Sequence, residues 1–378
     1  MRRWHKRYLF AGIILLSLPG CEVDWRKCDS YQELLDLSVR RGLPGAVMLV
    51  ETPDSLWIGT AGLADIGTEV SMQVTDRFRI ASITKTFVTV VVLQLVEEGI
   101  LSLDATIGEY LPEIADSIPH SSGITIRHLL NHTSGVYNYT DDNLLWHKAL
   151  RDYSWQGGGP RELVKSAYFT GHKPYFEPGT GYHYSNTNYL LLELILESVT
   201  DSTLAWLLGS RILEPLAMES TFLEGTLGTP IDFVTGYDIE WGQHHDVKGM
   251  SFARGMGDGG FISNVFDIHT FIRALFSCSL FIKPSTLDTM LVLNPEADYC
   301  LGLMYRNDYG YDAWGHEGNW PGYLSVFYYW PGRDAILILI VNGSGLYLFK
   351  RIAKHALRLL FVPENCQQSI SIVHLDIF

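Results

Sequence analysis

The stretch Phe78-Arg-Ile-Ala-Ser82-Ile-Thr-Lys85-Thr-Phe87 runs from a short β-like segment into a predicted helix. Ser82 stands at or near the start of this helix, and Lys85 follows by almost one turn, so both project from the same face. The positive end of the helix dipole favours the alkoxide that develops when a serine attacks. In a desolvated cleft Lys85 loses its proton more easily and becomes a base. The stretch indicates a serine nucleophile, although a capping serine beside a solvated lysine gives the same pattern.

A second stretch, Pro178-Gly-Thr-Gly-Tyr-His-Tyr184-Ser-Asn186-Thr-Asn-Tyr189, places a phenol and an amide just before a predicted helix. A phenol relays a proton, and an amide side chain orients a substrate peptide bond. A helix-capping turn accounts for the same letters. Tyr184 and Asn186 are therefore candidates for proton transfer and substrate contact.

A third stretch, Gly315-His316-Glu317-Gly318-Asn319, is followed by Trp320-Pro-Gly-Tyr-Leu-Ser325, which enters a predicted strand. An edge strand flanked by glycine exposes backbone N–H groups that hold an oxyanion or extend a substrate peptide. The alternative is a strand-entry turn with a surface histidine.

In the order SxxK, YxN and HxG, the three stretches resemble the serine β-lactamase-related family of class C β-lactamases, D-alanyl-D-alanine carboxypeptidases, D-aminopeptidases and esterases. The resemblance covers about residues 30–362 and continues in 101–111, 124–136 and 259–264. It implies an acyl-enzyme serine hydrolase without metal or cofactor, acting on an ester or a D-amino acid amide or peptide, with weak β-lactam hydrolysis. The alternatives are a true D,D-carboxypeptidase or β-lactamase, and a non-catalytic cell-wall-binding lipoprotein on the same scaffold.

The resemblance also implies a role for each residue of the three motifs. Ser82 is the acylated nucleophile, Lys85 its basic partner and Tyr184 the proton shuttle to the leaving group. His316 occupies the catalytic position that class C β-lactamases fill with lysine. The backbone N–H groups of Ser82 and Asn319 form the oxyanion hole, and the substrate-binding side comprises Asn186, Glu317, Gly318 and Asn319.

Glu317 departs from the family, whose β-lactamases and carboxypeptidases usually have threonine there to meet the substrate carboxylate. If Glu317 faces the cleft, it repels that carboxylate by roughly 4 kcal/mol at an effective dielectric near 20 and a separation of about 4 Å. It also raises the pKa of His316, because a nearby opposite charge favours imidazolium. If it points to the other face of the strand, neither effect follows.

Hairpin signals lie near both ends of the chain, at 45–51 with 55–61 and at 322–330 with 335–341. Helical patterns occupy 30–41 and 346–361, and between the hairpins they occupy 87–99, 126–132, 161–168, 189–199 and 204–213. We expect a mixed α/β fold of the α+β type, β-lactamase/transpeptidase-like, with one antiparallel sheet flanked by the N- and C-terminal helices. The catalytic domain spans 30–362, with a sheet lobe at about 30–81 and 246–362 and a helical lobe at about 82–245. The site lies between the lobes.

The chain of 378 residues has 28 basic and 42 acidic residues, a net charge of −14. Such an acidic protein repels phosphate backbones, so we expect no nucleic-acid partner. With 47% hydrophobic residues the chain can form a sizeable core. We expect a monomer that acts on a small molecule or a peptidoglycan peptide.

Residues 1–20 read as a signal peptide with a basic start, a short apolar run over 8–17, and Leu18-Pro-Gly-Cys21. The ending resembles a lipobox, in which the cysteine is lipidated; an ordinary secretory signal is the alternative. We expect an exported, periplasmic protein, lipid-anchored to the outer membrane through Cys21. Residues 21–29 form a tether and 363–378 a C-terminal tail.

Four further cysteines, Cys28, Cys278, Cys300 and Cys366, allow three disulfide pairings in an exported protein. Cys28 and Cys366 flank the first and last predicted helices and could meet. Unpaired thiols are the equal alternative, and the spacings show no zinc pattern.

Overall fold

The computed structural model describes residues 25–141, 158–169, 171–226, 232–240, 242–250 and 255–362. The predicted signal peptide, Cys21 and the tail at 363–378 lie outside the described residues. No helix within these ranges is both long enough and apolar enough to cross a membrane.

The main sheet joins segments from both ends of the chain. Its seven strands are antiparallel in the order β3-β2-β1-β12-β11-β10-β9, and β1 pairs with β12 from Ala46 opposite Val341 to Glu51 opposite Ile336. This pairing confirms the single antiparallel sheet predicted from two distant hairpins. The strands are β1 (Gly45–Thr52), β2 (Ser55–Asp65), β3 (Val70–Ser71), β9 (Met304–Asp308), β10 (Tyr311–Trp320), β11 (Tyr323–Trp330) and β12 (Ala335–Val341).

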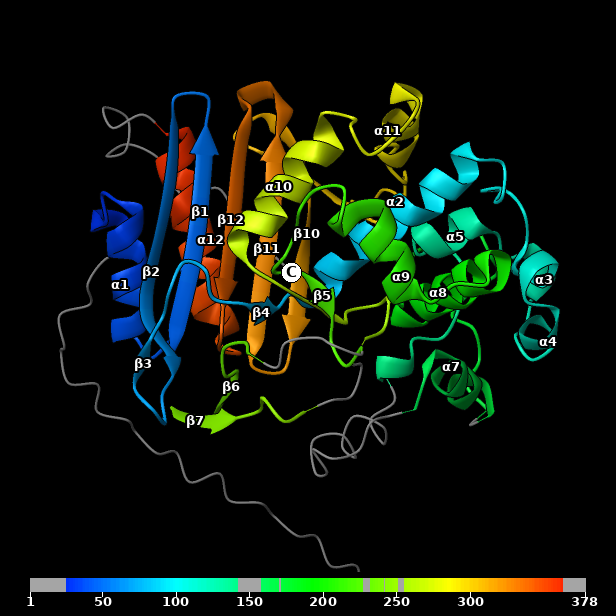
Figure 1. Ribbon diagram of the computed structural model, residues 1–378, viewed down its shortest axis with the longest axis horizontal. Coiled ribbons are helices and arrows are strands. Elements are labelled where there is room, and N and C mark those ends of the chain that lie inside the picture. The colour runs from blue at the N-terminus through cyan, green and yellow to red at the C-terminus, as the bar shows by residue number, and fades with distance from the viewer. Residues whose placement is uncertain are drawn as a thin grey trace, which may run out of the picture.

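Helices cover both faces of this sheet, as Figure 1 shows. α1 (Tyr31–Arg40) and α12 (Leu346–Phe361) lie against one face, and their apolar side chains form a buried cluster with alternate residues of β1, β11 and β12. α10 (Val265–Phe276) packs against the other face, where a larger cluster continues into the helical lobe. The predicted fold class and flanking helices are confirmed.

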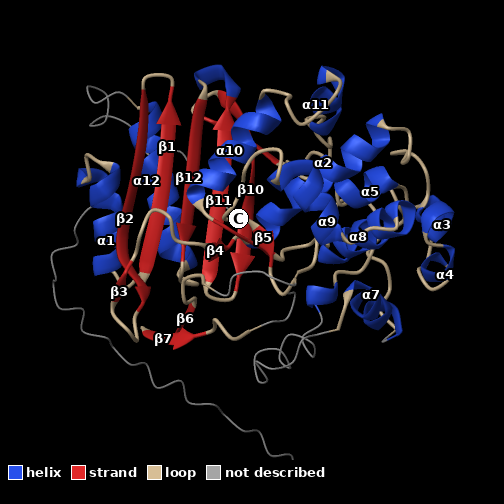
Figure 2. Cartoon of the chain, viewed as in Figure 1, coloured by secondary structure: helices blue, strands red, loops and turns tan. Residues whose placement is uncertain are grey.

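The helical lobe lies beyond β10 in Figure 2. Its helices are α2 (Thr84–Glu97), α3 (Ile107–Tyr110), α4 (Pro112–Ala115), α5 (Ile126–Leu130), α7 (Pro160–Phe169), α8 (Asn186–Thr200) and α9 (Leu204–Leu208), and α11 (Pro284–Met290) lies nearby. Two small sheets complete the fold, one of β4 (Phe78–Arg79), β8 (Phe261–Ser263) and β5 (Phe222–Leu223), the other of β6 (Tyr237–Glu240) and β7 (Gln243–Asp246).

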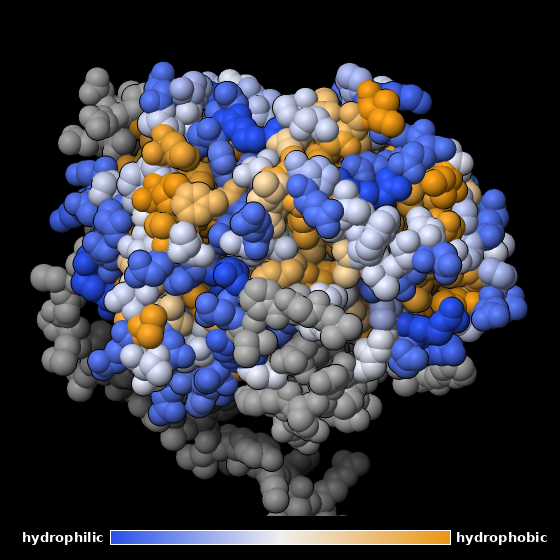
Figure 3. Space-filling model, in the orientation of Figure 1, coloured by the Kyte–Doolittle hydropathy of each residue, from blue (hydrophilic) through white to orange (hydrophobic). Residues whose placement is uncertain are grey.

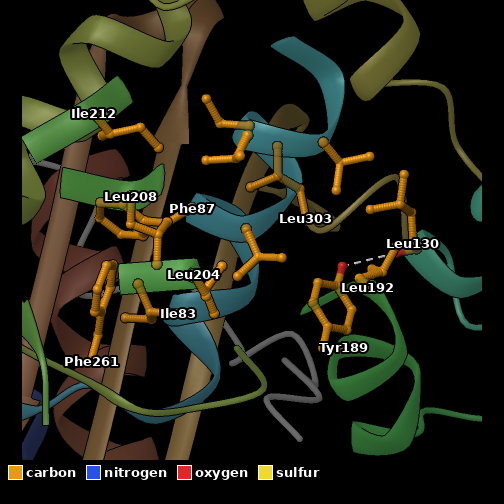
Figure 4. Close-up of a cluster of buried hydrophobic side chains, with 14 of the residues drawn as sticks. Ile83, Phe87, Leu130, Tyr189, Leu192, Leu204, Leu208, Ile212, Phe261 and Leu303 are labelled. Carbon is orange, nitrogen blue, oxygen red and sulfur yellow. Dashed lines mark hydrogen bonds between the residues drawn. The ribbon is translucent and has the colours of Figure 1, made fainter. Parts of the chain in front are cut away.

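α2 is apolar on all sides and buried along most of its length, which is typical of a central helix. Its neighbours converge on Phe87, whose ring lies 3.6 Å from that of Phe271 and 5.0 Å from that of Phe261, centroid to centroid. Figure 4 shows this cluster, with Leu204 and Leu208 of α9 beside it. The start of α2, which carries Lys85 and directly follows the turn with Ser82, is therefore anchored in the core.

Most of the remaining apolar residues are internal. On the face drawn in Figure 3, hydrophobic side chains lie in several small groups between hydrophilic ones. Cys28, Cys278 and Cys300 form no disulfide with one another. Cys366 lies outside the described residues, so its pairing with Cys28 stays a prediction.

Candidate active site

Ser82 lies in a tight turn, η2 (Ala81–Ile83), between β4 and α2. Ala81 has a φ of 48°, a left-handed conformation that is strained for a residue with a side chain. The Thr84 hydroxyl donates to the Ala81 carbonyl at 2.7 Å, and the Ser325 hydroxyl donates to the carbonyl of Ile80 at 2.8 Å. These contacts from two elements fix the turn and present the half-buried Ser82 side chain.

Gly318 lets β10 approach this turn closely. A Cβ atom at this position would lie 2.2 Å from the Ser325 hydroxyl oxygen and 2.3 Å from the Ile80 carbonyl oxygen. Any side chain would therefore push β10 away from Ser82. The glycine of the third motif thus acts through backbone proximity.

Lys85 is completely buried beneath Ser82. Its Nζ atom donates to the Ser82 hydroxyl at 3.0 Å, to Asn186 Oδ1 at 2.7 Å, and to the backbone carbonyl of Asp258. Burial disfavours the ammonium and lowers the pKa of Lys85 to about 7, against the opposing effect of the Asp258 carboxylate. A lysine with this pKa can take a proton from Ser82 near neutral pH.

Tyr184 and Asn186 complete the surroundings of Lys85. The Tyr184 ring centroid lies 5.1 Å from Lys85 Nζ, and Tyr184 lines the pocket together with Ser82. Burial raises the pKa of Tyr184 well above its usual value, so the phenol keeps its proton and suits a donor or relay better than a base. Asn186 donates one amide hydrogen to Thr140 Oγ1 at 3.0 Å, which leaves the second for a ligand.

His316 is buried behind Tyr184, and their ring centroids are 6.4 Å apart. Burial and the charge of Lys85 lower the pKa of His316 to about 3. The neutral ring donates from Nδ1 to the Glu317 carbonyl at 2.7 Å, so Nε2 accepts from the Tyr299 hydroxyl at 2.9 Å. The expectation of an imidazolium is therefore wrong, because burial and a nearby cation both favour the neutral form.

The Glu317 side chain points away from Ser82. Successive residues of a strand face opposite sides of the sheet, and Glu317 lies with Tyr328, whose hydroxyl donates to it at 3.3 Å. Burial raises the pKa of Glu317 to about 7, and Arg306 counteracts this. The expectation that Glu317 lies in the cleft and repels a substrate carboxylate is therefore wrong.

A pocket of about 860 Å³ opens at Ser82, within the size range of small-molecule sites. β9 pairs with β10 only as far as Gly315, so beyond it the described strands leave one edge of β10 unpaired beside the pocket. Three of the described lining residues are aspartates, and none of the described ones is lysine, arginine or histidine. The described lining comprises Ala81, Ser82, Asn138, Tyr139, Thr140, Asp141, Tyr184, Asn186, Asp238, Asp258, Gly259, Asn319, Trp320, Pro321 and Ser344.

The described geometry gathers the first two motifs around Lys85, with the third alongside, and comparison with known proteins shows a shared family. A family model described as beta-lactamase matches residues 29–360. The chain belongs to the β-lactamase family. Penicillin-binding protein 4* of Bacillus subtilis (strain 168) is 29% identical over 345 residues, 85% of this chain and 74% of that protein. A D-aminopeptidase of Cereibacter sphaeroides (strain ATCC 17029 / ATH 2.4.9) is 25% identical over 83% of this chain and 60% of its own length.

Solved structures agree with this β-lactamase family assignment. A D-stereospecific amidohydrolase from Streptomyces sp. aligns with a TM-score of 0.75 and 31% identity, covering 86% of this chain and 96% of the other. The D-amino acid amidase of Ochrobactrum anthropi SV3, complexed with L-phenylalanine amide, aligns with a TM-score of 0.75 and 27% identity, over 87% and 96%. The protein is thus a serine hydrolase of the β-lactamase family.

Sequence reasoning missed the acidic residues of this β-lactamase-family pocket. Asp258 stands in Gly255-Met-Gly-Asp-Gly-Gly260, which reads from the sequence as a turn. A lone aspartate among glycines was the available signal. No sequence signal pointed to Asp141 or Asp238, because their position in the pocket beside Ser82 depends on how the lobes pack.

Proposed function

We propose that this protein hydrolyses amides or short peptides of D-amino acids that carry a free amino group, through an acyl-enzyme on Ser82. The observation that carries the proposal is the charge of the pocket, whose described lining has no basic residue and places Asp141 and Asp238 on its walls. The similarity to D-amino acid amidases and a D-aminopeptidase supports the substrate class and its stereochemistry.

In the first step, neutral Lys85 takes the proton of Ser82 while Oγ bonds to the amide carbon and the carbonyl electrons move to the oxygen. The backbone N–H groups of Ser82 and Asn319 stabilise that oxyanion. Return of the proton through Tyr184 to the leaving nitrogen lets the C–N bond break and releases ammonia or an amine. Water then attacks the ester carbon and gives a proton to Lys85. The bond from that carbon to Ser82 Oγ breaks, Lys85 returns the proton to Oγ, and the free acid, Ser82 and neutral Lys85 are restored.

The aspartates lie on both walls of the pocket. Asp141 belongs to the helical lobe, where Asn138 Nδ2 and the Tyr175 hydroxyl donate to it at 2.9 and 2.6 Å. Asp238 belongs to β6 on the opposite side and accepts from the Ser344 hydroxyl. A substrate ammonium is attracted to either wall, whereas a substrate carboxylate is repelled. This arrangement disfavours penicillins and peptides that end in a free D-alanine carboxylate.

We expect D-alanine amide and D-phenylalanine amide to be turned over at least tenfold faster, in kcat/KM, than their N-acetyl derivatives, because acetylation removes the ammonium. Nitrocefin, which carries a carboxylate, should be a poor substrate. Replacing Asp238 with asparagine should raise nitrocefin acylation about tenfold, equivalent to about 1.4 kcal/mol of transition-state stabilisation. Steady-state kinetics with this panel measure all three effects.

Glu317→Gln is the matched control, since it removes a buried carboxyl that faces away from the pocket. It should leave nitrocefin acylation unchanged. Rapid nitrocefin hydrolysis by the wild type that does not respond to Asp238→Asn would contradict the charge argument.

We further propose that this enzyme is exported and anchored to the outer membrane by a lipid on Cys21. Support comes from the basic start, the short apolar run and the lipobox-like ending of residues 1–21. Cells fed labelled palmitate should incorporate the label into the wild type and not into Cys21→Ser. Label that persists in the serine variant would rule out this anchor.

A further inference from the structure

Asp258 brings a second charged group to the buried side of the nucleophile. Asp258 is only 5% exposed, and its Oδ2 atom accepts a hydrogen bond from the Tyr139 hydroxyl at 2.6 Å. The other oxygen, Oδ1, is buried without a hydrogen-bond partner among the described residues. The backbone carbonyl of the same residue accepts from Lys85 Nζ, and the carboxylate, which makes no ion pair with Nζ within 4.0 Å among the described residues, still acts on the ammonium through its charge and raises the pKa of Lys85.

Burial shifts the pKa values of the other titratable groups around Lys85 and Asp258 in the direction that favours their neutral forms. The nearby phenols have raised pKa values and the two histidines lowered ones, each mainly through burial. Burial raises the pKa of the Glu193 carboxyl, on α8, well above its usual value and so favours its neutral form. These groups are Tyr139, Tyr184, Tyr189, His132, His316 and Glu193.

We propose that Asp258 is a positioning residue whose buried carboxylate is the counter-ion of the Lys85 ammonium and sets the pH range in which Lys85 activates Ser82. The proposal rests on the roles proposed above for Ser82 and Lys85. It goes beyond them because it assigns the operating pH to a residue that touches neither substrate nor reacting atoms.

A buried carboxylate has a cost that an apolar residue at this position would avoid. The arrangement offsets part of that cost. Burial raises the pKa of Asp258 above its usual value, and the charge of Lys85 and the hydrogen bond from Tyr139 both oppose that rise. Asp258 and Lys85 titrate as a coupled pair. The acid limb of the pH–rate profile, where activity falls as the pH is lowered, therefore reports both groups.

Asp258→Asn tests the proposal, because asparagine keeps the shape, the backbone carbonyl and an oxygen that can accept from Tyr139. Loss of the carboxylate removes the attraction that raises the pKa of Lys85 and leaves only burial, which lowers it. The rate of Ser82 labelling by an uncharged fluorophosphonate, measured from pH 5 to 9, should therefore rise at lower pH. We expect the acid limb to move down by about one pH unit or more, so that labelling at pH 6 becomes about tenfold faster relative to the plateau.

Glu193→Gln is the matched control, because Glu193 is equally buried and binds the neighbouring Gly257 N–H at 2.8 Å. It removes no charge, so its acid limb should coincide with that of the wild type. If the acid limb of Asp258→Asn also coincides with that of the wild type, the proposal is overturned, whether or not the plateau rate of labelling falls.

Tyr139→Phe decides the question if Asp258→Asn does not fold. Loss of the hydroxyl raises the pKa of Asp258 and weakens the counter-ion, so this limb should also move to lower pH. An unmoved limb in folded Tyr139→Phe overturns the proposal in that case. Labelling that persists in Ser82→Ala refutes the nucleophile assignment instead, which separates the two failures.

Discussion

Replacing Ser82 with alanine should lower kcat by about 10⁴-fold or more and abolish covalent labelling, because no other group replaces the attacking oxygen. The wild-type Oγ lies 3.0 Å from Lys85 Nζ at the floor of the pocket. Intact-protein mass spectrometry after incubation with a fluorophosphonate should show one adduct in the wild type and none in the variant. The pocket itself should persist, since the turn is fixed by Thr84 and Ser325.

Ser185→Ala is the matched control for this experiment. Ser185 is next to Tyr184 in the chain, and its hydroxyl is buried without a hydrogen-bond partner among the described residues. Its removal should leave both labelling and turnover near wild-type values. Equal labelling of Ser82→Ala and the wild type would show that another residue carries the acyl group.

Local signals in the sequence were sufficient for most of the fold. The Pro331-Gly-Arg-Asp334 turn between two apolar runs predicts β11 and β12, and these strands pair from Leu324 opposite Val341 to Trp330 opposite Ala335. The N-terminal hairpin was equally clear, and β1 and β2 pair from Gly45 to Thr52. Such signals lie within a few residues of one another, so they do not depend on the tertiary structure.

Other features depended on contacts between distant segments. The helix predicted over 204–213 ends as α9 at Leu208 and continues as a π-helical turn from Gly209 to Leu213. The face of the sheet on which Glu317 lies could not be derived from its neighbours, because Gly315, His316 and Gly318 give no alternation of apolar and polar residues. Pairing with Val326 on β11 places Glu317 on the face away from the pocket.

In the candidate site too, local sequence signals were readable and contacts between distant segments were not. The spacing of Ser82 and Lys85 fixed their proximity, and the structure places Asn186 against them from 101 residues away. Asp258, 173 residues from Lys85 in the chain, comes close to it because the loop before β8 packs against α2 near Val88. Such a long-range charge has no local pattern, so the pH behaviour of the site could not be predicted from the motifs.

Replacing Lys85 with arginine should lower kcat/KM by about 10²- to 10⁴-fold, the usual contribution of a positioned base. Arginine keeps a positive charge but does not lose its proton at any pH of the assay. Lys85→Met, which removes both charge and base, should lose a similar factor. The comparison separates proton transfer from electrostatic stabilisation, and thermal unfolding of each variant checks that the buried position tolerates the change.

The pKa of Lys85 determines the direction in which kcat/KM changes with pH. Lys85, with a pKa of about 7, is mostly protonated at pH 6 and mostly neutral at pH 8. If the neutral amine is the base, wild-type kcat/KM rises about tenfold per pH unit below 7 and levels off above it. Both variants should lack this limb, because neither has an amine that titrates there. An arginine variant that retains wild-type kcat/KM would show that Lys85 supplies only its charge, and Tyr184 would then have to take the proton of Ser82 despite its raised pKa.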